Sequence, residues 1–90
     1  METIWKFDVP IGDEISVKMP KGAKLLSVQA QHDMPCVWAL VDSSDKIGTR
    51  KFAWRGTGHL SAALTREMYV GTIQLHGGSL IFHLFDRGFK

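Results

Sequence analysis

The hydrophobic positions of this chain alternate with polar ones over short runs, and turn-forming residues separate the runs. β-Branched and aromatic side chains are frequent in these runs, and such alternation predicts strands with one buried face. Only Ser61–Glu67 has the composition of a short helix, with Ser61 as its cap. The predicted strands are Thr3–Val9, Glu14–Met19, Lys24–Gln31, Cys36–Asp42, Arg50–Arg55, Tyr69–His76 and Ser79–Asp86.

These strands leave connections of only a few residues each. The pattern therefore predicts one all-β domain over residues 1–90. Its expected architecture is a small antiparallel β-sandwich or barrel of about seven short strands, with at most one short helix.

The last predicted hairpin turns at Gly77-Gly78, a pair typical of two-residue turns that need positive φ angles. This turn places an apolar face on one side, where Leu75 faces Leu80, Ile73 faces Phe82 and Gly71 faces Leu84. The other face mixes polar and apolar groups. Its expected pairs are His76 with Ser79, Gln74 with Ile81, Thr72 with His83, and Val70 with Phe85.

The middle hairpin is expected to turn at Asp33-Met34, or through a longer loop of the same parity. One face then collects Leu26, Val28, Ala30, Val37, Ala39 and Val41. The opposite face pairs Gln29 with Trp38, Gln31 with Cys36 and Ser27 with Leu40. A slip of one residue would mix the two faces, so the hydrophobic pattern specifies the register.

A chain of 90 residues has too little material to cover both faces of such a sheet. Exposed faces of mixed character are typical of partner surfaces, which favours a homo-oligomer, a dimer or higher. The alternatives are scattered surface hydrophobics, or terminal segments containing Trp5, Phe7 or Phe89 that fold over the face. The expected interface residues are Trp38, Val70, Ile81 and Phe85.

Composition narrows the class of protein. With 44% hydrophobic and 22% charged residues, the chain is typical of a folded globular protein, not a disordered one. It has no apolar run of membrane-spanning length and no signal-peptide layout, so we expect no membrane partner. Cys36 is the single cysteine, which favours the reducing cytoplasm. A net charge of +2 is small for a binder of duplex nucleic acid.

The positive charge is nevertheless local, because no acid interrupts a stretch that contains Lys46, Arg50, Lys51, Arg55 and Arg66. Within it, the segment from Trp54 to His59 reads WRGTGH. Two glycines around a threonine let backbone N–H groups converge on an anion, and arginine, histidine and tryptophan beside them suit a phosphate carried by a planar ring. The alternative is an ordinary glycine-rich turn that leaves a strand.

Other chemistries have weaker support. His76 and His83 lie roughly 13 Å apart along the predicted hairpin, too far to share a metal ion, so we expect no metal. Cys36 is expected to be a buried or interfacial thiol, not a nucleophile. A metal-free hydrolase that uses His59 and His83 stays an alternative. No catalytic residue and no cofactor is assigned.

Several segments resemble a family of small bacteriophage and prophage proteins of unknown function. They are Thr3–Phe7, Met19–Gln29, Pro35–Asp42, Gly56–His59 and Tyr69–Phe85, of which the last two are the most specific. The resemblance implies a genomic setting and the cytoplasm of a host bacterium, but no activity. Small phage proteins often act by binding a host protein or a defence signal, and some unrelated families sequester nucleotide messengers between subunits.

The resulting hypothesis is a non-catalytic homo-oligomer that sequesters a small anionic, nucleotide-like ligand and so counters host defence. The first alternative is an accessory factor that binds a host protein, and the second is the hydrolase. The expected ligand-binding residues are Trp54, Arg55, Gly56, Thr57, Gly58, His59, Gln74, His76 and His83.

Overall fold

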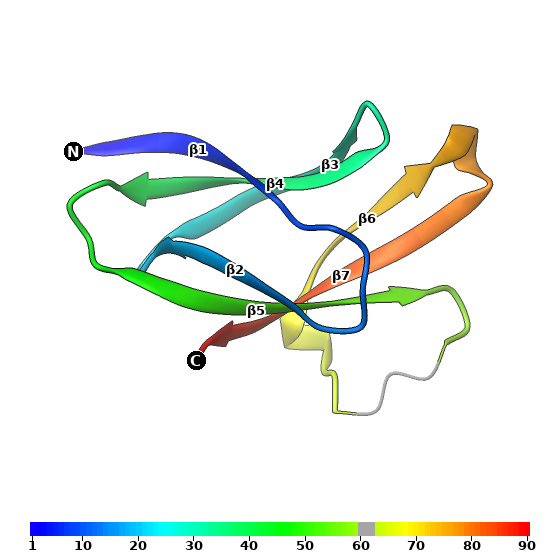
Figure 1. Cartoon of the computed structure of the whole chain (residues 1–90). Coiled ribbons are helices and arrows are strands. Elements are labelled where there is room, and N and C mark those ends of the chain that lie inside the picture. The colour runs from blue at the N-terminus through cyan, green and yellow to red at the C-terminus, as the bar shows by residue number, and fades with distance from the viewer. Residues whose placement is uncertain (60–62) are drawn as a thin grey trace.

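The computed structural model describes residues 1–59 and 63–90 (Figure 1). The strands in this part of the chain are β1 Glu2–Asp8, β2 Ile15–Pro20, β3 Lys24–Gln31, β4 Met34–Asp42, β5 Ile47–Gly56, β6 Tyr69–Leu75 and β7 Leu80–Phe89. Two 3-10 turns accompany them, η1 Arg66–Met68 and η2 His76–Gly78. The predicted all-β class is therefore confirmed.

The strands form two antiparallel sheets, one in the order β1-β4-β3 and the other in the order β2-β5-β7-β6. The two sheets approach each other most closely where β3 meets β6 (Figure 1). A Cβ atom added to Gly71 on β6 would lie 2.4 Å from a Val28 methyl group on β3. Glycine is thus required at this point because the strands are in direct backbone-to-side-chain contact.

The core lies between the sheets and takes alternate residues from each strand. β4 contributes Val37, Ala39 and Val41, and β5 contributes Phe52 and Trp54, all at most 2% exposed. This alternation is what half-buried strands require, and it leaves Trp38 and Leu40 on the outer face.

The register of the last hairpin is confirmed near its turn. Gly77 and Gly78 have φ angles of 68° and 97°, and the Ser79 N–H donates to the His76 carbonyl at 3.3 Å. Pairing follows the prediction from Leu75 with Leu80 to Gly71 with Leu84.

A β-bulge between Tyr69 and Gly71 then changes the register. Tyr69, not Val70, faces Phe85, so the predicted Val70–Phe85 pair is wrong. Val70 instead packs against the core. Leu80 departs from the predicted buried face as well, because it is 42% exposed near the turn.

The middle hairpin turns one residue earlier than predicted, at His32-Asp33, both with positive φ. Asp33 belongs to a residue type that tolerates this region. Val28 consequently faces Val37, and Ala30 faces Pro35. The outer face pairs Gln29 with Cys36, Gln31 with Met34 and Ser27 with Trp38, in place of the predicted partners. Because pairing shifts by two residues, the predicted faces survive.

Leu26 is the exception on the predicted apolar face of this hairpin. A bulge between Leu25 and Ser27 turns it outward, where it is 48% exposed, and Leu25 packs against the core in its place. The predicted helix also differs. Ser61 lies outside the described residues, residues 63–65 are not helical, and the one helical turn in this region is η1.

Candidate functional site

The loop after β5 is a tight turn that His59 closes. Its N–H donates to the Gly56 carbonyl at 3.1 Å, and Gly58 takes a φ of 84° that suits glycine. In return, the Gly56 N–H donates to His59 Nδ1 at 3.2 Å. A Cβ on Gly56 would lie 2.7 Å from the imidazole, so a larger residue here would push the ring aside. The Gly56 amide is therefore directed at His59, and the predicted anion nest loses one of its donors.

This loop borders a surface hollow of about 390 Å³. The register explains how the hollow forms, since Gly56 faces Phe82 and so brings the loop beside the start of β7. Its volume lies within the range of small-molecule sites. Its lining residues are Gly56, Thr57, His59, Ser79, Leu80, Ile81 and Phe82.

A chain of hydrogen-bonded side chains leads away from the hollow along the outer face of the four-stranded sheet. Thr57 Oγ1 and His83 Nε2 lie 2.8 Å apart, and His83 Nδ1 lies 2.9 Å from Thr72 Oγ1. The Tyr69 hydroxyl completes the chain through Thr72. Both imidazole nitrogens of His83 are thus bonded to hydroxyl groups, which fixes the orientation of Thr57 at the rim. Sequence reasoning missed Tyr69, because only the bulge in β6 brings it to this position.

Trp54 does not have the predicted role of a stacking platform. Its side chain is 2% exposed, and its indole Nε1 donates to the Val9 carbonyl at 3.0 Å. It contacts Phe82 edge-on, with 6.5 Å between ring centroids. Trp54 is a core residue, and no planar ligand reaches its face.

Arg55 is held by backbone carbonyls. Its Nη1 donates to Asp13 at 3.0 Å and to Trp54 at 2.8 Å, so it anchors the segment before β2. Arg55 precedes Gly56, which lines the hollow, but the Arg55 side chain itself does not line it.

Gln74 and His76 also lie away from the hollow. The His76 N–H donates to Asp33 Oδ1 at 3.2 Å, and its Nδ1 lies 3.5 Å from Asp33 Oδ2, which joins the tips of two hairpins. The Gln74 side chain lies over Gly78: a Cβ atom added to Gly78 would lie 3.0 Å from Gln74 Oε1. Of the nine predicted ligand residues, the hollow brings together Gly56, Thr57 and His59, with His83 bonded to Thr57.

The four predicted interface residues do not form one patch. Trp38 belongs to β4 of the three-stranded sheet, whereas Ile81 and Phe85 lie on the outer face of the four-stranded sheet. Phe85 contacts Tyr69 edge-on, with ring centroids 5.9 Å apart. Val70 packs inward. Trp38 therefore lies on a different sheet from Ile81 and Phe85, and the predicted residues do not make one flat contact surface.

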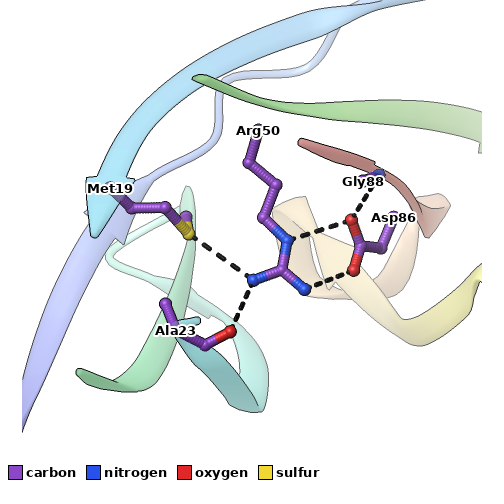
Figure 2. A network of polar contacts seen from close by, with 5 residues as sticks. All are labelled: Met19, Ala23, Arg50, Asp86 and Gly88. Carbon is purple, nitrogen blue, oxygen red and sulfur yellow. Dashed lines mark hydrogen bonds and ion pairs between the residues drawn. The ribbon is translucent and has the colours of Figure 1, made fainter. Parts of the chain in front are cut away.

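A second hollow, of about 260 Å³, is lined in part by Arg50 and Asp86. Sequence analysis did not predict the ion pair that these two residues form, which Figure 2 shows. Arg50 donates to Asp86 through Nε at 3.1 Å and Nη2 at 2.6 Å, and its Nη1 donates to the Ala23 carbonyl at 2.8 Å. Arg50 therefore contributes no free charge to the basic stretch. The hollow is lined by Leu25, Leu26, Arg50, Glu67, Met68, Tyr69, Val70 and Asp86.

Cys36 is 1% exposed although it does not belong to the core cluster between the sheets. On its outer side, Lys6 Nζ donates to Gln31 Oε1 at 2.8 Å, and the register places these two side chains diagonally on either side of Cys36. Burial raises the pKa of the Cys36 thiol above its usual value, and the charge of Lys6 offsets part of this rise. Cys36 thus lacks the electropositive, accessible setting of a nucleophile.

We expect Cys36 to react slowly with iodoacetamide. A raised pKa leaves less thiolate at any given pH, so the rate–pH profile should have its midpoint at higher pH than that of a free cysteine. At pH 8 the folded protein should react on the order of tenfold or more slowly than the same protein in urea. Mass spectrometry of the alkylated chain measures both rates. Equal rates in the two conditions would contradict the burial of this thiol.

Among the described residues, no three or more His, Cys, Asp or Glu side chains come close enough together to hold a metal ion. The same part of the chain contains no helix with the length and apolar character needed to cross a membrane.

Residues 1–89 match the family model described as Domain of unknown function DUF7352. The chain belongs to this family. No curated protein and no solved structure matches the chain. The match spans all the strands of the DUF7352 fold, so both hollows lie within it.

Proposed function

We propose that this DUF7352 chain binds a small anionic, nucleotide-like ligand in the hollow beside Gly56–His59 without transforming it, and that it acts as a homo-oligomer. The observation that carries this proposal is the hollow itself, about 390 Å³ in volume and bordered by a Gly-Thr-Gly-His turn. Small-molecule sites are typically concave and mostly apolar, with a few polar groups that orient the ligand.

The lining of the hollow combines apolar side chains with polar ones. Leu80 and Ile81 are 42% and 39% exposed, and with Phe82 they offer an apolar wall for a planar ring. Thr57 and His59 also line the hollow and carry polar groups that can hydrogen-bond to an anionic ligand. Trp54 is buried, so in this proposal the planar ring of the ligand packs against Leu80, Ile81 and Phe82 of β7 and not against Trp54.

The biological setting that we propose is the cytoplasm of a bacterium infected by a phage. The resemblance of Gly56–His59 and Tyr69–Phe85 to phage and prophage proteins supports this setting. A protein that holds a nucleotide signal intact would lower its free concentration and so weaken a host defence response.

The test compares two charge-adding variants. Thr57→Glu places a carboxylate at the rim of the hollow and should weaken binding of an anionic nucleotide on the order of tenfold or more. Ser43→Glu adds the same charge in the exposed β4–β5 turn, at the opposite end of β5, and should leave binding unchanged. Isothermal titration calorimetry against a panel of mono-, di- and cyclic nucleotides measures both affinities.

Native mass spectrometry of the purified protein, followed by denaturation, identifies what it carries. Recovery of an intact nucleotide supports sequestration. Recovery of cleavage products would favour the hydrolase, and a panel without any binder together with capture of one host protein would favour the accessory factor. Equal affinities of the two variants would mean that the ligand does not bind beside Thr57.

A further inference from the structure

The strand β1, Glu2–Asp8, forms the outer edge of the three-stranded sheet and carries no strand partner on its open side among the described residues. All of its residues except Phe7 are exposed. Ile4 is 56% exposed and Trp5 is 38% exposed, on opposite faces of the strand. An edge strand with apolar side chains is a template for a further strand, because its outward N–H and C=O groups need partners.

The other three edges of the fold are better protected. β3 and β6 are the inner edges of the two sheets and approach each other, as the contact of Gly71 with Val28 shows. β2 exposes Ser16 and Lys18 and ends in Pro20, which donates no hydrogen bond. β1 thus differs from the other edges in combining two exposed large apolar side chains, Ile4 and Trp5, with an open side and no proline.

The charges along β1 can pair with those of a second copy of the same strand in an antiparallel register. A two-fold axis perpendicular to a sheet keeps each side chain on its own face, so such a pair must be centred on a residue. Centred on Ile4, Glu2 faces Lys6 of the second copy, and Thr3 faces Trp5. The two ends of the outer face then carry opposite charges in contact.

Neighbouring registers lack this complementarity. Centring on Trp5 places Glu2 opposite Asp8, and centring on Lys6 places two lysines opposite each other. Like charges directly opposite each other destabilise a strand pair, whereas opposite charges stabilise it. Centring on Phe7 also places Lys6 opposite Asp8, but it pairs only residues 6–8 of β1, whereas centring on Ile4 pairs residues 2–6. Charge and pairing length together therefore favour the register centred on Ile4.

We propose that a second copy of this chain adds to β1 in the antiparallel register centred on Ile4. The result is a continuous six-stranded sheet, β3-β4-β1 from each copy. On its outer face Ile4 already lies beside Leu40, so the two copies join their apolar side chains into one row across the dimer. Lys6, which donates to Gln31 in the single chain, changes partner to Glu2 of the second copy.

This interface specifies the self-association in the proposed function and differs from the interface that sequence analysis predicted. It involves neither hollow, because the lining residues of both lie outside β1. Ligand binding and dimerisation are therefore separate measurements.

The test reverses each charge in a separate variant and then mixes the two variants. Lys6→Glu and Glu2→Lys each place like charges opposite one another twice in the dimer, and each should raise the dimer Kd on the order of tenfold. An equimolar mixture of the two variants restores both opposite-charge contacts and should form a 1:1 heterodimer. Native mass spectrometry and sedimentation equilibrium measure the species, and Lys18→Glu on β2 is the matched control that leaves the dimer intact.

The outcomes separate the possibilities. Heterodimer formation from two variants that do not self-associate supports the register and shows that both variants fold. A dimer that ignores both reversals, or a mixture without heterodimer, would overturn the β1 interface alone. A wild-type chain that stays monomeric would overturn this inference and the proposed self-association, while the nucleotide titration still decides ligand binding.

Discussion

Replacing Asp86 by alanine should lower the free energy of unfolding by about 3 kcal/mol, because it leaves a largely buried guanidinium without its counter-ion. The side chain of Arg50 is 12% exposed and that of Asp86 is 21% exposed. The carboxylate accepts two hydrogen bonds from Arg50 and one from the Gly88 N–H, as Figure 2 shows.

The surroundings of the Arg50 guanidinium explain why the loss of Asp86 should lower stability. Its carbon lies 6.0 Å from the ring centroid of Phe52 and 5.0 Å from that of Phe89, and Nη1 contacts the Met19 sulfur at 3.7 Å. These neighbours supply little hydrogen bonding to a cation that has lost its partner. The pair also joins β5 to β7 beside the smaller hollow.

Urea denaturation of two further variants tests this reasoning. Glu14→Ala removes the exposed partner of Arg87, whose N–O distance is 3.4 Å, and should cost less than about 1 kcal/mol. The double variant Arg50→Met with Asp86→Leu removes both charges and should recover most of the loss. If Asp86→Ala cost no more than Glu14→Ala, the burial of this pair would have no energetic consequence.

The parts of the fold that sequence analysis predicted well are those specified locally. Gly77-Gly78 is a strong turn signal, and the register follows from it as far as Gly71. The bulges at Leu26 and Val70 were missed; both lie close to the point where Gly71 of β6 meets Val28 of β3. A bulge needs no particular residue, so the sequence contains no local signal for it.

The candidate site divides in the same way. The glycines around Thr57 predicted the turn that borders the hollow, since a tight turn depends on a few neighbouring residues. The pairing of Arg50 with Asp86 was not predictable, because 36 positions separate them in sequence. For Trp54 a signal was present: it alternates with Phe52, which is the pattern of a core face, and it faces Leu84, a residue predicted to be buried.

The reassignment of Trp54 leads to the second large expected effect. Trp54→Ala should lower the free energy of unfolding by about 3–5 kcal/mol, because it opens a cavity in the core. A chain of this length has a total stability of only about 5–13 kcal/mol, so the variant is expected to be severely destabilised. A ligand-stacking residue on the surface would instead be removed with little effect on stability.

Trp54→Phe keeps an aromatic ring in the core and should fold. It therefore allows the prediction to be tested even if Trp54→Ala does not fold. It leaves the Val9 carbonyl without the indole N–H that it accepts at 3.0 Å, a loss of about 1–3 kcal/mol. Urea denaturation measures the stability of both variants, and nucleotide titration of the phenylalanine variant measures its affinity. A stable Trp54→Ala variant that no longer binds nucleotide would return Trp54 to the ligand site and contradict its place in the core.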